Sequence, residues 1–270
     1  LVFYIWPFIQ NIWFSFNEVS KFNVATFCGL ANYQKLFHDG EVLKTFGNTL
    51  KYVVVTVPVG LFLSILIATL LNSKIKGTSI YRTLYFLPSV TMAAAVAMVW
   101  KWIYNEKMGI LNSVIRALGG KGIGWLTDPK IALYSVMIVG LWMSVGYNMI
   151  ILLAGMQGIS KSYYEAAQID GATSLQTLFK VKIPMVMPSI TICTFLTLTN
   201  GFKLFDQNLA LTNGGPDKMS EMLALNIYYT FYGRTGWEGV GQAKAVIFFI
   251  IVGVIALIQN KLTTSKEVQQ

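Results

Sequence analysis

The chain has 270 residues, of which 54% are hydrophobic and only 12% are charged, and its formal net charge is +9. Soluble domains carry about 25% charged residues, so this composition excludes an ordinary water-soluble enzyme. In so apolar a chain, the excess of basic residues favours membrane lipid as the partner and argues against nucleic acid. Two distant cysteines and a single histidine, His38, offer no disulfide framework, no metal site and no His-based catalytic site.

Stretches without any charged residue define the expected membrane spans. They cover residues 1–16, 52–71, 83–100, 131–160, 183–202 and 245–260. A bilayer core needs about 20 apolar helical residues, and none of these runs shows the alternation of a membrane strand. We therefore predict a single-domain, all-α, polytopic membrane protein over residues 1–270. About six transmembrane helices are expected, at about 1–17, 50–72, 83–104, 131–157, 183–205 and 244–261.

The first and last of these spans are short for a bilayer. Residues 1–16 have neither a basic leading region nor a small-residue cleavage site, so we interpret them as the latter part of a helix that begins before Leu1. Residues 245–260 lie between Lys244 and Lys261, and both lysines are expected to extend towards water at the ends of this span.

The loops between the spans alternate in length, and this predicts the orientation. Basic residues in short loops mark the cytoplasmic side of a membrane protein. If the short and intermediate loops share one side, both termini lie there too, and we place that side in the cytoplasm. Its basic residues are Lys74, Lys76, Arg82, Lys161, Lys180, Lys182, Lys261 and Lys266.

The segment 160–182 reads as two short helices joined by a turn. Ser162 and Glu165 have the spacing of a capping box at the start of the first helix. Asp170-Gly171 signals the turn, and Thr173 or Ser174 can cap the second helix. A small capped amphipathic helix on a loop is suited to docking in a groove of a partner protein.

Three stretches carry a family resemblance. Glu165-Ala166-Ala167, then Gly171, then Val181-x-Ile183-Pro184 resemble the EAA loop of permease subunits in bacterial ATP-binding-cassette importers. Phe202-Lys203-Leu204-Phe205-Asp206, followed by Leu211-Thr212-Asn213-Gly214-Gly215-Pro216, is similar to the first permease subunit of the carbohydrate-uptake branch, the maltose-permease F type. Residues 81–88 (YRTLYFLP) also resemble that branch.

The resemblance implies a specific assembly in the bacterial cytoplasmic membrane. The chain would have the type I ABC importer fold and pair with a second, distinct permease subunit. Two ATPase subunits would bind ATP and Mg, and an extracytoplasmic solute-binding protein would deliver a carbohydrate. This chain would bind no cofactor and catalyse no reaction; its Gly119-Gly120-Lys121-Gly122 does not match a phosphate-binding loop. The implied ATPase-coupling residues are Tyr164, Glu165, Ala166, Ala167, Asp170, Gly171 and Ala172.

Aromatic and amide side chains near the fourth and fifth spans are the candidates for a sugar path. Asn148 and Asn200 are costly in lipid and would face the bundle interior, although interhelical hydrogen bonding explains them equally well. Lys203 and Asp206 are expected to pair across one helical turn; a cavity-facing Lys203 would instead admit an acidic sugar. The full candidate set is Trp142, Tyr147, Asn148, Asn200, Phe202, Lys203, Phe205 and Asp206.

An intramembrane enzyme is poorly supported by a chain with a single histidine, and two other classes of transport protein are alternatives to an importer subunit. A secondary transporter would normally carry an ionisable residue inside a span, and the uncharged runs contain none. A channel for a small polar solute fits the composition, but it has no need of the Glu165–Gly171 helix. The aromatic residues of loop 206–242, such as Tyr228 and Tyr232, suit either a binding-protein contact or packing within this subunit.

Overall fold

The computed structural model describes residues 2–19, 25–73 and 76–265. Leu1, Lys74 and Lys266, which enter the predictions above, lie outside the described residues. The chain divides into two compact units. Unit 1 comprises Leu1–Tyr52, Ala97–Val136 and Phe202–Ile255, and unit 2 comprises Val53–Val96, Met137–Gly201 and Ala256–Gln270.

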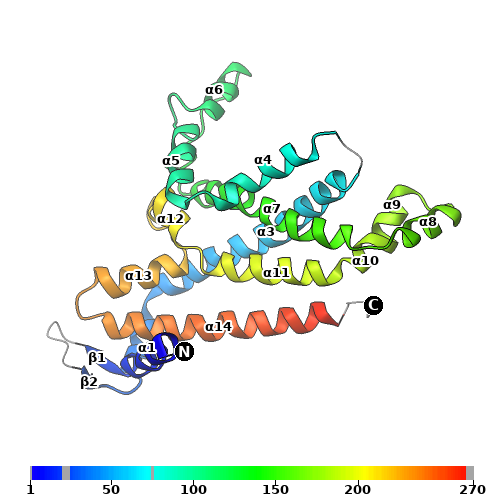
Figure 1. Cartoon of the computed structure of the whole chain (residues 1–270). Helices are drawn as coiled ribbons and strands as arrows, with labels where there is room; N and C mark the ends of the chain where they lie inside the picture. Colours follow the sequence, from blue (N-terminus) through cyan, green and yellow to red (C-terminus); the bar gives the residue numbers. More distant parts are fainter. Residues whose placement is uncertain (1, 20–24, 74–75, 266–270) are drawn as a thin grey trace. The chain divides into compact units, whose positions relative to one another are not determined.

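The described chain is mostly helical with almost no strand, which confirms the all-α fold class; one short antiparallel hairpin, β1 with β2, follows the first helix (Figure 1). The elements in chain order are α1 (Val2–Ser15), β1 (Asn17–Val19), β2 (Ala25–Phe27), α2 (Ala31–His38), α3 (Gly40–Leu71), α4 (Thr78–Val90), α5 (Ala93–Ile103), α6 (Ile110–Ala117), α7 (Ala132–Gln157), α8 (Lys161–Ile169), α9 (Ser174–Thr177), the π-helical turn η1 (Leu178–Lys182), α10 (Ile183–Met185), α11 (Met187–Phe202), α12 (Asp206–Leu211), α13 (Leu223–Gly233) and α14 (Glu238–Thr264).

Three of the described helices, α3, α7 and α14, are long and apolar enough to cross a membrane. Two bent pairs raise this number to five if each pair is one span. Helix α1 has only 14 described residues, fewer than a bilayer core requires.

The bent pairs occur where single spans were predicted over 83–104 and 183–205. Helices α4 and α5 meet at 102°, and the helical stretch Ser174–Met185 meets α11 at 72°. Each bend lies beside a proline, which lacks the N–H that a continuous helix needs. Helix α4 ends two residues after Pro88, where Thr91 is extended, and the second break lies between Pro184 and Pro188.

Small residues allow close helix packing within unit 2. A Cβ atom added to Gly146 of α7 would lie 1.8 Å from the backbone oxygen of Tyr85 in α4. A Cβ atom at Gly155 would lie 2.3 Å from Ser189 Oγ of α11. Beside these contacts, Met149, Leu152 and Cys193 belong to a fully buried apolar cluster. Small residues at helix crossings are the usual means of packing helices in a membrane.

We predict that Gly146→Ala destabilises the protein, because the new methyl group meets backbone rather than a movable side chain. The expected cost is about 1–3 kcal/mol, the range for overpacking. Gly253→Ala is the matched control, since nothing lies within 4 Å of a Cβ atom there. Thermal unfolding in detergent should show a lower midpoint for Gly146→Ala and an unchanged or higher one for Gly253→Ala. Equal midpoints would contradict the packing described.

Candidate functional site

Helix α8 begins differently from the sequence prediction. Its N-cap is Ser160, whose extended backbone precedes the helix and whose hydroxyl hydrogen-bonds the Ser162 hydroxyl at 2.9 Å. Ser162 already lies inside the helix, so the capping box predicted for Ser162 and Glu165 is wrong, because an N-cap must have non-helical backbone angles. Glu165 is exposed and forms no ion pair with any described residue. Its carboxylate is therefore available to another molecule.

A tight turn connects α8 to α9. Gly171 has φ of +71°, and nothing lies within 4 Å of a Cβ atom there, so the backbone angle rather than space requires glycine. The N–H of Ala172 donates to Ala167 O at 2.9 Å and closes the turn. Thr173, one of the two predicted caps, caps α9 in a reciprocal capping box with Gln176.

One face of α8 packs on unit 2. Ala167 is buried, and Tyr164 packs against the apolar cluster of unit 2 and donates its hydroxyl to Met156 O at 3.4 Å. Burial raises the pKa of Tyr164 and keeps the phenol neutral. The ammonium of Lys182 lies 5.6 Å from the centre of the same ring. Tyr164 and Ala167, both predicted coupling residues, therefore join α8 to the body of unit 2.

Exposed apolar side chains lie on α8 and on the two segments that follow it. Ile169 is 86% exposed, and Leu175, Phe179 and Tyr163 are also exposed. Together with Glu165, they form what we call the coupling surface: Tyr163, Glu165, Ile169, Leu175 and Phe179. Exposed apolar groups beside an unpaired charge are typical of a docking surface for another protein.

Four of the predicted sugar-path residues lie in unit 2. Asn148 is buried, and its amide donates to Thr197 Oγ1 at 2.8 Å, which joins α7 to α11. This contact matches the interhelical alternative for Asn148. Trp142 and Tyr147 are each 46% exposed, and Asn200 is exposed at the end of α11.

The other four lie in unit 1. Phe202 is fully buried, whereas Lys203 and Asp206 are exposed. No ion pair joins Lys203 to Asp206 in the described part of the chain, so the predicted pair is wrong. Helix α11 ends at Phe202, so the spacing of one helical turn no longer brings the two side chains together.

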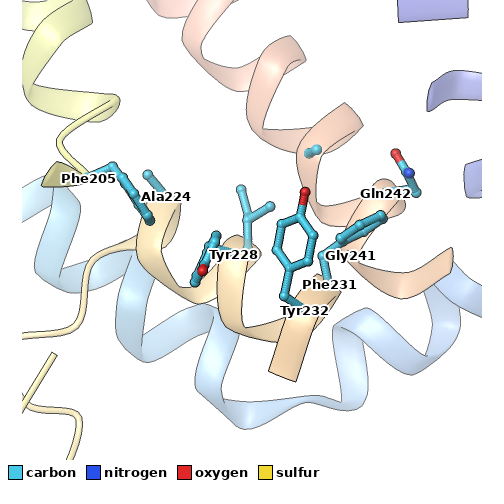
Figure 2. A pocket seen from close by; sticks show the side chains of 9 residues that line it. Phe205, Ala224, Tyr228, Phe231, Tyr232, Gly241 and Gln242 are labelled. Atoms are coloured by element: carbon cyan, nitrogen blue, oxygen red, sulfur yellow. The ribbon is translucent and has the colours of Figure 1, made fainter. Parts of the chain in front are cut away.

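Phe205 lines a pocket of about 470 Å³ in unit 1 (Figure 2). Helix α13 carries Tyr228, Phe231 and Tyr232, and Gly241 and Gln242 face them from α14. The centre of the Tyr228 ring lies 5.2 Å from that of Phe205 and 5.0 Å from that of Tyr232. None of the described charged residues lines this aromatic pocket, which comprises Phe205, Ala224, Ile227, Tyr228, Phe231, Tyr232, Gly241, Gln242 and Ala245.

Sequence reasoning placed Phe205 on the sugar path but did not join it to Tyr228, Tyr232 and Gln242. The available signal was the spacing of residues 224, 227, 228 and 231, which recur at helical intervals and so share one face of α13. Several of these rings pack on one another, which agrees with the second of the two alternatives given for them, packing within this subunit.

A buried ammonium lies on the other side of α13. Lys244 Nζ donates at 2.8 Å to each of three oxygen atoms, Asp39 Oδ2, Asn226 Oδ1 and Thr230 Oγ1. The Lys244 side chain is only 1% exposed, so the prediction that it extends towards water is wrong. Helix α14 starts at Glu238, which places Lys244 in its second turn rather than at its end.

Asp39 is the charged partner of Lys244. Burial raises the pKa of Asp39, but the hydrogen bond and charge of Lys244, the backbone N–H of Glu41 and the charge of Arg234 together outweigh this. The pKa of Asp39 is therefore held below its ordinary value of 3.8. A lowered folded-state pKa means that this contribution to stability is present above pH 3.8 and is lost as the pH falls through the folded pKa.

No group of three or more His, Cys, Asp or Glu side chains that could hold a metal ion occurs among residues 2–19, 25–73 and 76–265.

Comparison with known proteins identifies relatives over nearly the whole chain. Residues 40–265 match the family described as "Binding-protein-dependent transport system inner membrane component". The "Probable starch degradation products transport system permease protein" of Thermoanaerobacterium thermosulfurigenes is 35% identical over 97% of this chain and 89% of its own. The "Multiple sugar-binding transport system permease protein" of Streptococcus mutans is 35% identical over 99% of this chain and 92% of its own.

A solved structure has the same fold. It is a chain of a bacterial ABC transporter involved in the import of the acidic polysaccharide alginate, with a TM-score of 0.86 and 19% identity. The match covers 98% of this chain and 91% of that chain. The predicted ABC importer permease fold is thereby confirmed.

We predict that Lys244→Met costs about 3–5 kcal/mol, because it leaves the Asp39 carboxylate buried without its ammonium partner. The double variant Asp39→Asn, Lys244→Met should recover part of this loss, since no uncompensated charge remains. Lys261→Met, at an exposed position of the same helix, should change stability by no more than about 0.5 kcal/mol. Thermal unfolding of the purified permease measures all three. An unchanged midpoint for Lys244→Met would show that the network does not stabilise the fold.

Proposed function

The chain belongs to the family of binding-protein-dependent transport system inner membrane components, and we propose that it carries a neutral sugar or oligosaccharide through an ATP-driven importer. It is a membrane-embedded transport permease. The observation that carries the coupling part of the proposal is the coupling surface of α8, α9 and η1. There, Glu165 forms no ion pair with any described residue and belongs to the same surface as exposed apolar side chains. The other face of α8 packs against the apolar cluster of unit 2.

Docking at this surface would link ATP binding to movement of the permease. A cytoplasmic ATPase subunit that takes α8 into a cleft can pull it when two ATPases close on ATP and Mg. The pull would reach the body of unit 2 through Tyr164 and Ala167, which pack there. ATP can shift the equilibrium between two conformations of the importer only if the binding free energies differ between those conformations. The ATPase must therefore bind α8 more tightly in one conformation than in the other.

The remaining partners follow from the same proposal. A second, different permease subunit completes the translocation path, and an extracytoplasmic solute-binding protein delivers the sugar on the face opposite the ATPases. The short loops rich in lysine and arginine would face the bacterial cytoplasm together with both termini. This chain then supplies no catalytic group, because the ATPase subunits hydrolyse ATP.

The aromatic pocket supports a neutral substrate. Its rings offer flat apolar faces, Tyr228 and Tyr232 add hydroxyl groups, and Gln242 adds an amide. Such a lining suits a sugar ring, which has apolar C–H faces and hydroxyl edges. The named relatives concern starch degradation products and multiple sugars, and no charged residue lines the pocket to pair with an acidic sugar.

Lys244 is an ionisable residue within a helix long enough to cross a membrane. Such a residue is a feature of ion-coupled secondary transporters, so this alternative has to be considered again. Its three donors are already taken by three acceptors on unit 1, and this saturation favours a structural role. A channel for a small polar solute gives no reason for the coupling surface.

Glu165→Lys and Gly171→Val should each reduce co-purification of the ATPase about tenfold or more and abolish sugar uptake. The first reverses the unpaired charge, and the second places a branched side chain at φ of +71°. Glu18→Lys and Gly236→Val are matched controls in unit 1, with an exposed carboxylate and a glycine at φ of +81°. Pull-down of the complex and uptake into vesicles measure the effect. Normal ATPase binding and uptake by both Glu165→Lys and Gly171→Val would disprove the coupling role.

Tyr232→Ala should lower sugar uptake about fivefold while leaving ATPase co-purification unchanged. The ring is 72% exposed at the pocket, and one aromatic contact contributes roughly 1 kcal/mol. Tyr4→Ala, which removes an exposed tyrosine from α1, is the control. Uptake of a starch-derived oligosaccharide at subsaturating concentration is the measurement. Equal uptake by the two variants would remove the pocket from the sugar path and leave the coupling proposal intact.

A further inference from the structure

Helix α6 presents its apolar side outward. Ile110, Val114 and Leu118 recur at intervals of four residues, so they lie along one face of the helix and its final turn. They are 48%, 52% and 84% exposed. A helix on the surface of a water-soluble protein normally turns such a stripe towards the core.

The polar side of α6 is directed inward instead. Asn112 is fully buried, and its amide donates to Ile123 O at 2.8 Å while its oxygen accepts from the N–H of Ile123 and from Trp125 Nε1. Arg116 donates to the carbonyl oxygens of Glu106 and Lys107. These bonds fix the rotation of α6, because turning its apolar stripe inward would break them and leave buried polar groups unsatisfied.

The surroundings of the stripe match an anionic membrane surface. Residues 101–130 contain five basic and two acidic residues, so this segment carries a net charge of +3. Lys107 and Lys121, on either side of α6, are exposed. An apolar stripe flanked by lysines is typical of helices that lie in the plane of the membrane interface.

Helix α5 leads to α6 with an exposed apolar surface of its own. Met98 and Val99 are 73% and 56% exposed, and Trp102, 59% exposed, lies beside Lys101 at the end of α5. Tryptophan and lysine at a helix end mark the boundary between the hydrocarbon core and water. Figure 1 shows α6 projecting past this end of α5.

We propose that α6 is an interfacial anchor, with Ile110, Val114 and Leu118 among lipid acyl chains and Lys107 and Lys121 at anionic headgroups. The inference depends on residence in a membrane and not on the sugar or the ATPase. The anchor holds the far end of the bent α4–α5 pair at the membrane surface, since the loop from Tyr104 to Gly109 is braced by hydrogen bonds from the N–H groups of Lys107 and Met108 to Asn105 Oδ1.

Spin labels test the anchor in the assembled importer, reconstituted in vesicles of phosphatidylcholine with or without phosphatidylglycerol. Cys28→Ser removes the more accessible native thiol, while Cys193 is buried. Val114→Cys carries the label on the stripe, and Ser113→Cys carries it at the exposed polar position next to the stripe as the matched control. The label at 114 should collide with lipid-soluble oxygen more than with a water-soluble nickel complex, and the label at 113 should show the reverse.

The lysines give a second, independent readout. In the parent, adding phosphatidylglycerol to the vesicles should bury the label at 114 more deeply. The double variant Lys107→Gln, Lys121→Gln should not show this increase, and its label should be as accessible as that of the parent in phosphatidylcholine alone. Accessibility of label 114 to the nickel complex would overturn the anchor, because the stripe would face water. Shielding of label 114 from both reagents would also overturn it, because a protein subunit would then cover the stripe. Sugar uptake by the same vesicles tests the proposed transport function separately.

Discussion

Inside an apolar helical chain, a polar group that leaves water must find its hydrogen-bond partner on protein, and the structure of this permease follows from that constraint. Lys244 satisfies its ammonium with Asp39, Asn226 and Thr230. In unit 2, Ser64 donates to the backbone oxygens of Gly60 and Val145. These two networks hold polar side chains of unit 1 and of unit 2 in one arrangement by bonds within the protein.

The apolar surfaces that stay exposed differ in the polar groups that accompany them. The coupling surface combines apolar side chains with the unpaired carboxylate of Glu165, which suits a protein cleft. The stripe on α6 has an exposed lysine before it in the chain, Lys107, and one after it, Lys121, which suits anionic lipid. The aromatic pocket has hydroxyl and amide groups but no charge, which suits a neutral sugar. The polar groups beside each surface are therefore the basis for the partner proposed for it.

The sequence predicts what local chemistry determines. Charge-free runs became helices, Gly171 took a left-handed backbone angle, and Thr173 capped α9. Prediction from the sequence failed where a side chain's contacts depend on residues distant in the chain, or where they depend on the residue at which a helix ends. Lys244 was expected at the end of a span because its acceptors lie 14–205 residues away. Lys203 and Asp206 were paired on the assumption that α11 continues beyond Phe202, and the bends beside Pro88 and Pro188 were not predicted.

The two faces of α13 bear on the proposal that the substrate is uncharged. Asn226 and Thr230 lie on the face where Lys244 is bound, and Glu221 accepts from the Asn226 amide there. Arg234, which follows the helix, pairs with Asp39 and Glu41. Lys244 and Arg234 are therefore neutralised by acids of the same unit, and among the described residues the pocket lining contains only apolar groups, rings, hydroxyl groups and the amide of Gln242. An acidic sugar would give up its hydration in this pocket without gaining a counter-charge, whereas a neutral sugar exchanges water for stacking and hydrogen bonds.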